Sequence, residues 1–282
     1  MAATNLKKRV IILGATGFIG QHLVPMLLRG GYEITALARD SARARSFDWF
    51  PEVDFIAHDI HGIAALTLNN ASGATLIHLA WPGLPNYKSL FHLEENLPKS
   101  YAFIEHMLKQ EVERVLVTGT CFEYGMQSGC LRADSPTQPA NPYALAKDTL
   151  RKQLHFLQEQ HPFTLQWARL FYMHGAGQNP KSVLAQLDAA IDRGDAVFNM
   201  SGGEQLRDYL PVTVVAQQLA ALLKKPSGIY NICSGTPISI RRLVEQRIQE
   251  RGAKIEINLG YYPYPDYEPM AFWGEPSVKA EQ

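Results

Sequence analysis

A glycine-rich turn near the N-terminus places the strongest constraint on how this chain can fold. The apolar run at residues 10–13 leads directly into the turn at 14–20, Gly-Ala-Thr-Gly-Phe-Ile-Gly, and a helical pattern follows it. A short, fully apolar run is typical of a buried parallel strand. A strand, a glycine turn and a helix in this order bring backbone N–H groups and the helix N-terminus close to a pyrophosphate. The segment predicts a dinucleotide site, although a tight turn that binds nothing has the same local signature.

The same alternation of strand and helix continues along the first 170 residues. Further apolar runs typical of strands are at 34–37, 53–56, 75–79, 114–118 and 165–170. Helical patterns run from about 97 to 109 and onward from Tyr143. This rhythm predicts an α/β fold of the Rossmann type, with a doubly wound parallel sheet.

The rhythm becomes irregular after residue 170, where Gly and Pro are frequent. We predict a dinucleotide-binding domain at 1–170 and a smaller, mainly substrate-binding C-terminal lobe at 171–282. Segments at about 207–235 are expected to return to the first domain. The aromatic stretch at 261–267 is expected to close over the carboxyl ends of the strands.

Composition excludes several classes of protein. The 282 residues are 46% hydrophobic, and Lys+Arg and Asp+Glu number 27 each, so the net charge is +0. A balanced charge does not favour nucleic acid or anionic membrane as a partner. No apolar run is long enough for a membrane span, and no signal peptide is visible, so we expect a cytoplasmic protein. Three scattered cysteines fit free thiols, and the pair His58 and His61 lacks further ligands, so no metal site is expected.

The end of the second predicted strand bears on the choice of cofactor. NAD-binding folds usually present an acidic residue there to the ribose hydroxyls. Counting from the glycines places Ala38 at that position and Arg39 directly after it. An arginine suits a 2′-phosphate, so NADP is the preferred cofactor, with NAD possible through Asp40. Asp59 and Ile60, after the third strand, are candidates to bracket the adenine, although Asp59 can also be a loop-capping residue.

The segment from Asn141 to Lys147 carries the chemistry. Asn141 is a good helix N-cap and Pro142 a good first helical residue, which places Tyr143 in the first turn. Lys147 follows four residues later, on the same face of the helix. An ammonium and a helix N-terminus both favour a phenolate, so we expect a lowered pKa for Tyr143. Thr120, at the carboxyl end of a predicted strand, can hydrogen-bond a substrate oxygen.

These motifs together resemble the extended short-chain dehydrogenase/reductase family, the NAD-dependent epimerases and dehydratases. The likeness rests on the glycine turn, His78-Leu79-Ala80, Asn96, Thr120, Tyr143 with Lys147, and the segments at 168–178, 207–212 and 230–232. The resemblance implies that Tyr143 is the general acid/base, that Lys147 binds the nicotinamide ribose, and that Thr120 polarises the carbonyl. It also implies that Arg207 pairs with the diphosphate of a nucleotide sugar and that Phe198 packs against the base.

Each implied role has a plainer alternative. Asn96 can support the site or cap a helix, Arg207 can pair with Asp208, and Phe198 can belong to the core. The expected cofactor-binding residues are Gly14, Thr16, Gly17, Phe18, Ile19, Arg39, Asp59, Ile60, Leu79, Ala80, Asn96, Thr118, Tyr143 and Lys147. The expected substrate-binding residues are Thr120, Tyr143, Phe198 and Arg207.

Departures from the family narrow the reaction. The 4,6-dehydratases that this chain resembles carry Asp-Glu directly after the catalytic Thr, where this sequence has Cys121-Phe122. The epimerase-reductases use a Cys at the position of Phe122. Tyr172 replaces an asparagine found in many members. We therefore expect an NAD(P)H-dependent reductase of a nucleotide-linked 4-keto-6-deoxyhexose, most simply a dTDP-sugar, in polysaccharide or deoxysugar biosynthesis.

Two alternatives stay open at this stage. One is a nucleotide-sugar 4-epimerase, and the other is a regulatory protein that senses NADPH without turnover. The resemblance also implies a homodimer in which the helix at 97–109 and the helix from Tyr143 pack against their mates. Leu97, Tyr101, Ile104 and Leu108 form a compatible stripe, although they can equally be core residues.

Overall fold

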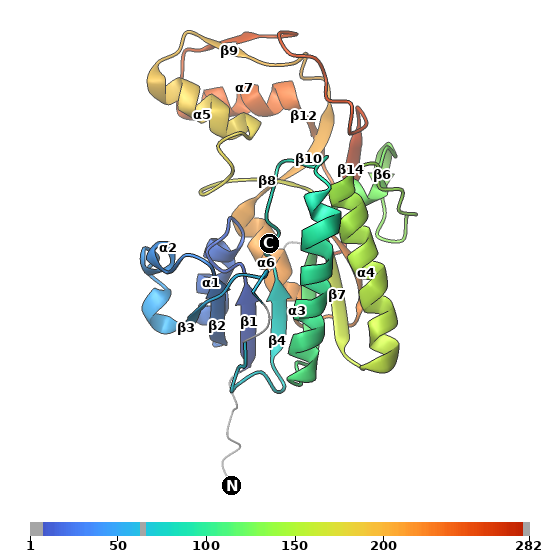
Figure 1. Cartoon of the computed structure of the whole chain (residues 1–282). Helices are drawn as coiled ribbons and strands as arrows, with labels where there is room; N and C mark the ends of the chain where they lie inside the picture. The colour runs from blue at the N-terminus through green and yellow to red at the C-terminus, as the bar shows by residue number, and fades with distance from the viewer. Residues whose placement is uncertain (1–7, 63–65, 279–282) are drawn as a thin grey trace.

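The predicted strands assemble into one parallel sheet in the computed structural model, which describes residues 8–62 and 66–278. The sheet has the order β11-β7-β5-β4-β1-β2-β3, and every neighbouring pair is parallel. Its strands are β1 (Arg9–Leu13), β2 (Glu33–Ala38), β3 (Asp54–Ala57), β4 (Thr75–His78), β5 (Arg114–Thr120), β7 (Thr164–Leu170) and β11 (Gly228–Ile232). This is the doubly wound arrangement expected from the sequence (Figure 1).

The connectivity places a ligand crevice between β1 and β4. From β1 the chain builds β2 and β3 on one side, and then returns to build β4, β5 and β7 on the other. In open α/β sheets, ligands bind outside the carboxyl ends of the strands at this switch in direction. The glycine turn follows β1, so it lies at the crevice.

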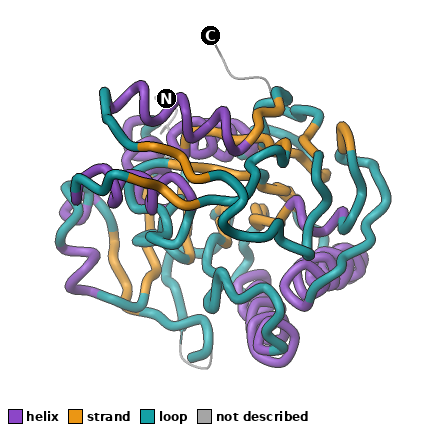
Figure 2. Tube along the Cα trace, turned by 90° about the horizontal axis from the view of Figure 1, so that it is seen from above, coloured by secondary structure: helices purple, strands orange, loops and turns teal. Residues whose placement is uncertain are grey.

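Helices cover both faces of the sheet. The core on one face includes residues of α1 (Gly20–Arg29) and α6 (Val212–Leu222), and the core on the other includes residues of α3 (Leu97–Lys109) and α4 (Pro142–Gln160). Viewed along the helices, α3 and α4 are seen end-on beside one another, away from the α1 side (Figure 2). Short α2 (Ser41–Arg45) follows β2.

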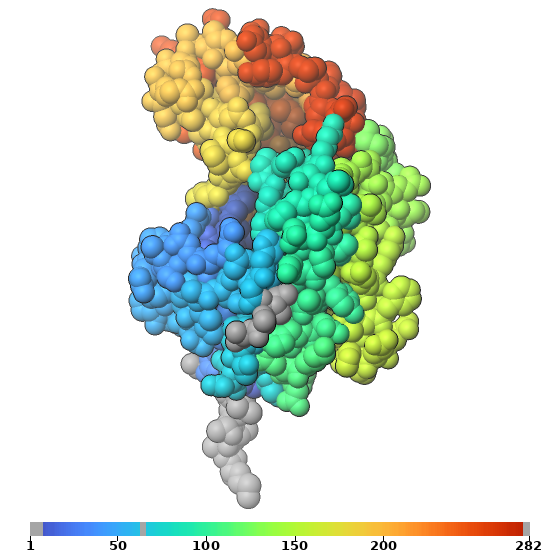
Figure 3. All heavy atoms as spheres, viewed as in Figure 1, coloured from blue at the N-terminus to red at the C-terminus, as the bar shows by residue number. Residues whose placement is uncertain are grey.

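A smaller lobe lies over the carboxyl ends of the strands (Figure 1), and the space-filling view shows a hollow between the two parts at one side of the molecule (Figure 3). The buried core of this lobe includes Leu187, Phe198, Met200 and Val244. Its elements are α5 (Val183–Arg193), α7 (Ile240–Arg251), β9 (Val197–Asn199) and β13 (Glu256–Asn258), and the linking strands are β6 (Gly129–Leu131), β8 (Tyr172–His174), β10 (Leu206–Pro211), β12 (Pro237–Ser239) and β14 (Phe272–Gly274).

The expected return of the chain near residues 207–235 has a structural counterpart. α6 packs in the core on the α1 face, and β11 pairs with β7 at the edge of the parallel sheet. We keep 1–170 and 171–282 as the proposed division. Within the described chain, none of the helices combines the length and the apolar character that crossing a bilayer requires.

The proposed dimer stripe differs from the structure at one position. Ile104 is completely buried against the sheet, whereas Leu97, Tyr101 and Leu108 are partly exposed. The i, i+4 spacing places these residues near one edge of the helix, but Ile104 is on the side that faces the core. Ile104 is therefore a core residue.

Candidate active site

The glycine turn forms one end of a large cavity between the sheet and the lobe. Gly14 has φ +93°, a conformation that strains other residues, and a Cβ there would lie 2.9 Å from the amide nitrogen of Ala80. A Cβ at Gly17 would lie 3.1 Å from the carbonyl oxygen of Gly14. The turn is therefore tightly wound in front of α1, with Gly14 and Gly17 lining a cavity of about 1520 Å³. This geometry fits the pyrophosphate of a dinucleotide.

Nearly every residue expected to bind the cofactor lies on this cavity wall. The expected residues that line it are Gly14, Thr16, Gly17, Phe18, Ile19, Arg39, Asp59, Ile60, Leu79, Ala80, Thr118, Tyr143 and Lys147. The backbone N–H groups of Leu79 and Ala80 both donate to the carbonyl of Leu13, which ties the end of β4 to the end of β1.

Asn96 is different, because it lies behind the wall. Its side chain is 1% exposed, and its Nδ2 donates to the carbonyl of Pro82 at 2.8 Å. It makes no capping hydrogen bond to α3. Asn96 therefore neither lines the cavity nor caps α3, and its side chain holds the loop after β4.

Arg39, rather than Asp40, faces the cavity. Asp40 is the N-cap of α2, where its Oδ1 accepts from the amide of Arg43 at 2.9 Å. The Nε of Arg43 in turn donates to the carbonyl of Thr16, in the glycine turn, at 3.1 Å. Arg39 lines the cavity and Asp40 does not. Asp59 lines it too, and its Oδ1 also accepts from the amide of His61, as the loop-capping alternative expects.

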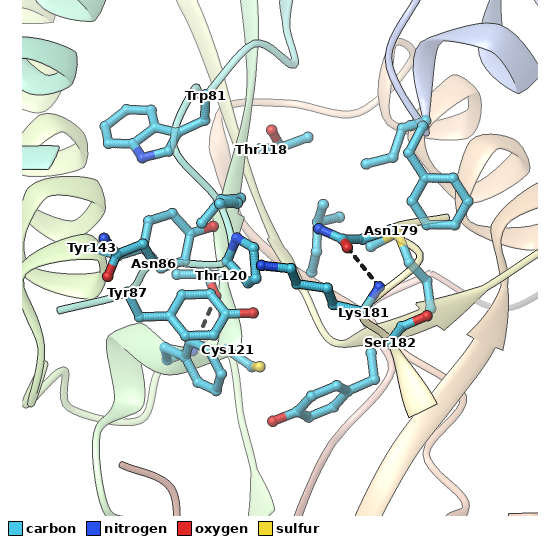
Figure 4. A pocket seen from close by; sticks show the side chains of 18 of the residues that line it. Trp81, Asn86, Tyr87, Thr118, Thr120, Cys121, Tyr143, Asn179, Lys181 and Ser182 are labelled. Atoms are coloured by element: carbon cyan, nitrogen blue, oxygen red, sulfur yellow. Dashed lines mark hydrogen bonds between the residues drawn. The ribbon is translucent and has the colours of Figure 1, made fainter. Parts of the chain in front are cut away.

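Thr120 and Tyr143 lie close together on the cavity wall (Figure 4), and Lys147 lines the same cavity. Thr120 ends β5, and its Oγ1 accepts from the amide of Phe122 at 3.3 Å, which leaves its O–H as a donor. The Asn141 side chain caps α4 by accepting from the amide of Ala144 at 2.9 Å, as the sequence indicated. This cap fixes Tyr143 in the first turn and Lys147 one turn later.

The expected lowering of the Tyr143 pKa is not what the protein alone produces. Tyr143 is only 7% exposed, and burial raises the pKa of its phenol well above the ordinary value, while hydrogen bonding with Thr120 opposes this. Burial lowers the pKa of Lys147 to about 7, with Glu123 opposing. The expectation gave weight to the charge and the helix end, but loss of hydration is the largest influence on the pKa of this buried phenol. Tyr143 is therefore a neutral phenol that can donate a proton.

The carboxylate nearest in sequence after Thr120 faces away from the cavity. Glu123 is fully buried, and it accepts from the amide of Thr120 at 2.9 Å, from Trp167 Nε1 at 3.0 Å and from Arg169 Nε at 2.7 Å. Cys121 and Phe122 line the cavity in its place. Burial raises the pKa of the Cys121 thiol, so this side chain is a poor base.

Arg207, expected to bind a diphosphate, is committed elsewhere. Its guanidinium is 2% exposed, lies 2.8 Å from the carboxylate of Glu268 and does not line the cavity. The guanidinium also donates to the carbonyls of Leu206 and Met270, and it lies over the ring of Phe272 at 4.7 Å. Arg207 does not form the plainer alternative, a pair with Asp208, because the Asp208 carboxylate accepts from the amides at positions 234 and 235.

Several wall residues were not identified from the sequence. Trp81 lies three residues after the end of β4, and the ring of Tyr87 packs 5.6 Å from the ring of Tyr143. Figure 4 shows Lys181 extending from its loop across the cavity toward Thr120. An aromatic residue two positions after the predicted strand at 75–79 was the available signal for Trp81. Phe198 lines the cavity and is also part of the lobe core.

Comparison with known proteins identifies relatives of the chain. It is 32% identical over 94% of its length, and 98% of the relative's, to a dTDP-6-deoxy-L-talose 4-dehydrogenase (NAD(+)) of Aggregatibacter actinomycetemcomitans. It is 30% identical over 92% of its length, and 83% of the relative's, to a dTDP-6-deoxy-L-talose 4-dehydrogenase (NAD(P)(+)) of Kitasatospora kifunensis.

The solved structures and the family comparison agree with these relatives. MoeE5 in complex with UDP-glucose and NAD is 25% identical, with a TM-score of 0.76 over 95% of this chain and 90% of that one. Residues 10–233 match the model described as the NAD dependent epimerase/dehydratase family. The resemblance drawn from the motifs is confirmed, and the chain belongs to the NAD dependent epimerase/dehydratase family.

Proposed function

We propose that the protein is an NAD(P)H-dependent reductase of the 4-keto group of a nucleotide-linked 4-keto-6-deoxyhexose. The observation that carries the proposal is that Thr120, Tyr143 and Lys147 share one cavity wall with the glycine turn. The two relatives named as dTDP-6-deoxy-L-talose 4-dehydrogenases support the sugar, because oxidation at C4 is the reverse of this reduction. dTDP-6-deoxy-L-talose is accordingly the product that we propose.

The proposed cofactor is NADP, bound along the wall from the glycine turn to Lys147. Arg39 lines the adenosine end, and the carboxylate of Asp40 is turned to its helix cap, so Arg39 is the side chain suited to a 2′-phosphate. The two relatives are named for NAD and for NAD(P), so the family admits either cofactor.

The chemistry follows from which proton donors are available. Reduced nicotinamide, when bound, supplies the hydride that reduces the C4 ketone. The Thr120 O–H donates to the carbonyl oxygen, because its own oxygen already accepts from Phe122. Tyr143 transfers its phenolic proton to that oxygen as the C–O double bond becomes a single bond, and the resulting phenolate is stabilised by the ammonium of Lys147. Net consumption of one hydride and one proton gives the alcohol.

A dehydratase is less well supported, because elimination of water needs an acid and a base beside the sugar. Three carboxylates line the cavity within the described residues: Asp59, Asp266 and Glu268. Asp59 lies with Arg39 at the adenosine end, Asp266 pairs with Lys88, and Glu268 pairs with Arg207. A 4-epimerase remains the second candidate, because a UDP-glucose 4-epimerase of Halalkalibacterium halodurans is 25% identical over 87% of this chain and 81% of that relative.

We also propose a homodimer formed through α3 and α4. Phe156 on α4 is 65% exposed, and it lines a shallow depression with Tyr101 of α3 and Leu157. An exposed phenylalanine between two long helices is suited to packing against a second copy of the same helices. Light scattering should show a dimer for the wild type and a monomer for Phe156→Glu.

A single assay tests the proposed function. Purified protein should oxidise NADPH with a dTDP-4-keto-6-deoxyhexose, and NMR should identify one C4 alcohol. A panel that includes UDP- and CDP-linked 4-keto sugars decides the base. Interconversion of 4-epimeric nucleotide sugars without net cofactor consumption would instead support the epimerase.

A further inference from the structure

Trp81 covers the catalytic lysine. The residue lies just after β4 on the cavity wall and is 9% exposed. Lys147 Nζ lies 3.9 Å from the centroid of its indole ring, well within the range of a cation–π interaction. The same indole meets the ring of Tyr143 edge-on at 6.1 Å. One side chain therefore contacts both members of the Tyr-Lys pair.

Lys147 has few other partners for its charge. Its side chain is 1% exposed, and its Nζ donates to the carbonyl of Thr118 at 2.7 Å. Among residues 8–62 and 66–278, no carboxylate lies within 4.0 Å of this nitrogen. A buried ammonium without a carboxylate needs other compensation, and the electron-rich indole face supplies it.

The titratable groups around Lys147 do not replace the indole. The negative charge of Glu123 raises the pKa of Lys147 from a distance, but this carboxylate is paired with Arg169. His78 and His92 also face Lys147, and burial lowers the pKa of both imidazoles, so they are neutral at physiological pH. Tyr143, on the same helix, is a neutral phenol.

A hydrogen-bonded support holds the indole in place. Trp81 Nε1 donates to His92 Nδ1 at 3.1 Å, and His92 Nε2 lies 2.9 Å from the carbonyl of Asn86. These partners fix the neutral tautomer of His92 with its hydrogen on Nε2. Asn96 holds the adjacent Pro82 carbonyl. His92 and Asn96 are the two ends of a π-helical turn, His92–Asn96, and such turns are frequent at functional sites.

We propose that Trp81 is a positioning residue, which holds the Lys147 ammonium in place for the cofactor and for Tyr143, and that His92 acts by fixing the Trp81 ring. The inference that Trp81 supports the Lys147 ammonium is based on the contacts described above. Its consequence for turnover rests on the proposed function. Trp81 is thus a fourth member of the constellation of Thr120, Tyr143 and Lys147, acting through the lysine.

The test measures how NADH binding depends on pH, by calorimetry between pH 6 and 9. NADH is used because it lacks the 2′-phosphate, which titrates in this range. Binding to the wild type should weaken as the pH rises through the pKa of Lys147, and Lys147→Met should abolish this dependence. In Trp81→Leu the midpoint should move down by roughly half a unit to one and a half units, as expected for losing a cation–π interaction. Trp81→Phe should move it less.

A matched control separates this effect from general damage to the core. Trp49 is also buried and stacks on Phe47 at 5.1 Å, but it does not line the cavity. Trp49→Leu should keep the wild-type midpoint, even if it lowers the melting temperature. The proposal is overturned if Trp81→Leu keeps the wild-type midpoint, if Trp49→Leu shifts it equally, or if wild-type binding is independent of pH.

The role of His92 is tested through Trp81. His92→Leu removes the acceptor for the indole N–H, whereas His92→Asn offers an oxygen near the position of Nδ1 and should restore most of the midpoint. In a Trp81→Phe background there is no indole N–H to hold, so His92→Leu should have little further effect. If His92→Leu shifts the midpoint by the same amount in the wild type and in the Trp81→Phe background, then His92 does not act through Trp81 and its proposed role is overturned.

The binding assay does not need a sugar substrate. If the wild type binds NADH with the expected pH response but reduces no nucleotide sugar, then the proposed function fails and the inference about Trp81 stands. If turnover is found and the midpoint does not respond to Trp81, then the inference fails and the proposed function stands. With turnover in hand, Trp81→Leu should lower kcat more strongly at pH 8 than at pH 6.

Discussion

The guanidinium of Arg207 and the carboxylate of Glu268 lie 2.8 Å apart, and both side chains are more than nine-tenths buried. The hydroxyl of Tyr172 also donates to Glu268. The resemblance implied an Arg207 directed at a diphosphate, but in the structure its charge is already neutralised within the protein. Glu268 belongs to the segment at 262–268 that lines the cavity, so this ion pair fastens that segment to β10.

We predict that breaking this pair destabilises the fold. Arg207→Met leaves Glu268 buried without its cation, which typically costs about 3–5 kcal/mol. Combining it with Glu268→Gln should recover part of the loss, because the two residues share one interaction. Urea unfolding measures the free energy of unfolding of the single and of the double variant. The exposed pair Arg132 and Asp134 provides the control, since Arg132→Met should change stability by no more than about 0.5 kcal/mol. Simple additivity of the first two substitutions would contradict the coupling.

The second prediction concerns the proton donor. Tyr143→Phe removes the phenolic O–H and keeps the ring packed between Trp81 and Tyr87. General acid catalysis typically contributes about 10²–10⁴-fold, so kcat should fall by that factor while the Kd for NADPH stays close to normal. Steady-state kinetics and calorimetry measure the two quantities. A variant that keeps more than about a tenth of the activity cannot have lost its general acid.

The third prediction concerns cofactor choice. Arg39→Ala should reduce the preference for NADPH over NADH by roughly 10- to 100-fold, the value of one charge-assisted hydrogen bond. Asp40→Asn is the control, because asparagine is also a good N-cap and the side chain at this position caps α2. Its cofactor preference should equal that of the wild type. If kcat/KM with the two cofactors is unaffected by Arg39→Ala, Arg39 does not contact the 2′-phosphate.

Local patterns predicted the part of the site that lies along the chain. The turn at Gly14, the cap at Asn141 and the alternation of strands and helices depend on neighbours in sequence, and the structure reproduces them. The cap by Asp40 was also predictable, because an Asp directly before a short helix is a common N-cap. From the sequence, Asp40 was considered only as a ribose ligand.

Contacts between distant segments were not predictable in this way. Glu268 and Arg207 come from different elements, and either charge alone fits an exposed site equally well. The pKa of Tyr143 depends on how completely the lobe and Tyr87 exclude water, which no spacing along the sequence expresses. The π-helical turn before α3 likewise depends on the hydrogen bonds of His92 and Asn96 to the loop after β4.

The fourth prediction follows from the buried ammonium. Lys147 has a pKa of about 7 in the folded protein, below its ordinary value of 10.5. Between these two values the unfolded chain binds more protons than the folded one, so the free energy of unfolding gains a contribution that rises with pH. The gain is at most about 1.4 kcal/mol per pH unit for one group. Below pH 7 both states are protonated, and the cost of burying the charge is fully present.

Lys147→Met removes this contribution. From pH 7 to pH 8.5, the free energy of unfolding of the wild type should therefore rise more steeply than that of the variant, as measured by urea unfolding at each pH. The buried thiols of Cys121 and Cys233 titrate in both proteins, so their effect cancels in the difference. Parallel curves would mean that Lys147 keeps an ordinary pKa in the fold.

The last prediction distinguishes a simple reductase from an enzyme that also rearranges the sugar. Epimerisation at C3 or C5 requires a group that removes a proton beside the ketone and another that returns one. Next to Thr120 the cavity offers Cys121, whose pKa burial raises, and Phe122, which cannot transfer a proton. Glu268 is held by Arg207 and by Tyr172. Reduction at C4 should therefore leave the neighbouring carbons as they were supplied.

Turnover in D₂O with unlabelled NADPH makes this visible by NMR. The new C4–H bond should carry the hydrogen of the cofactor, and no carbon-bound deuterium should enter C3 or C5 beyond that in an enzyme-free control. The control is needed because the ketone itself can exchange its neighbouring protons with solvent. Glu268→Gln should give the same labelling pattern, since Glu268 has no part in proton removal. Enzyme-dependent deuterium at C3 or C5 would show an epimerase-reductase, and its loss in Glu268→Gln would identify Glu268 as the base.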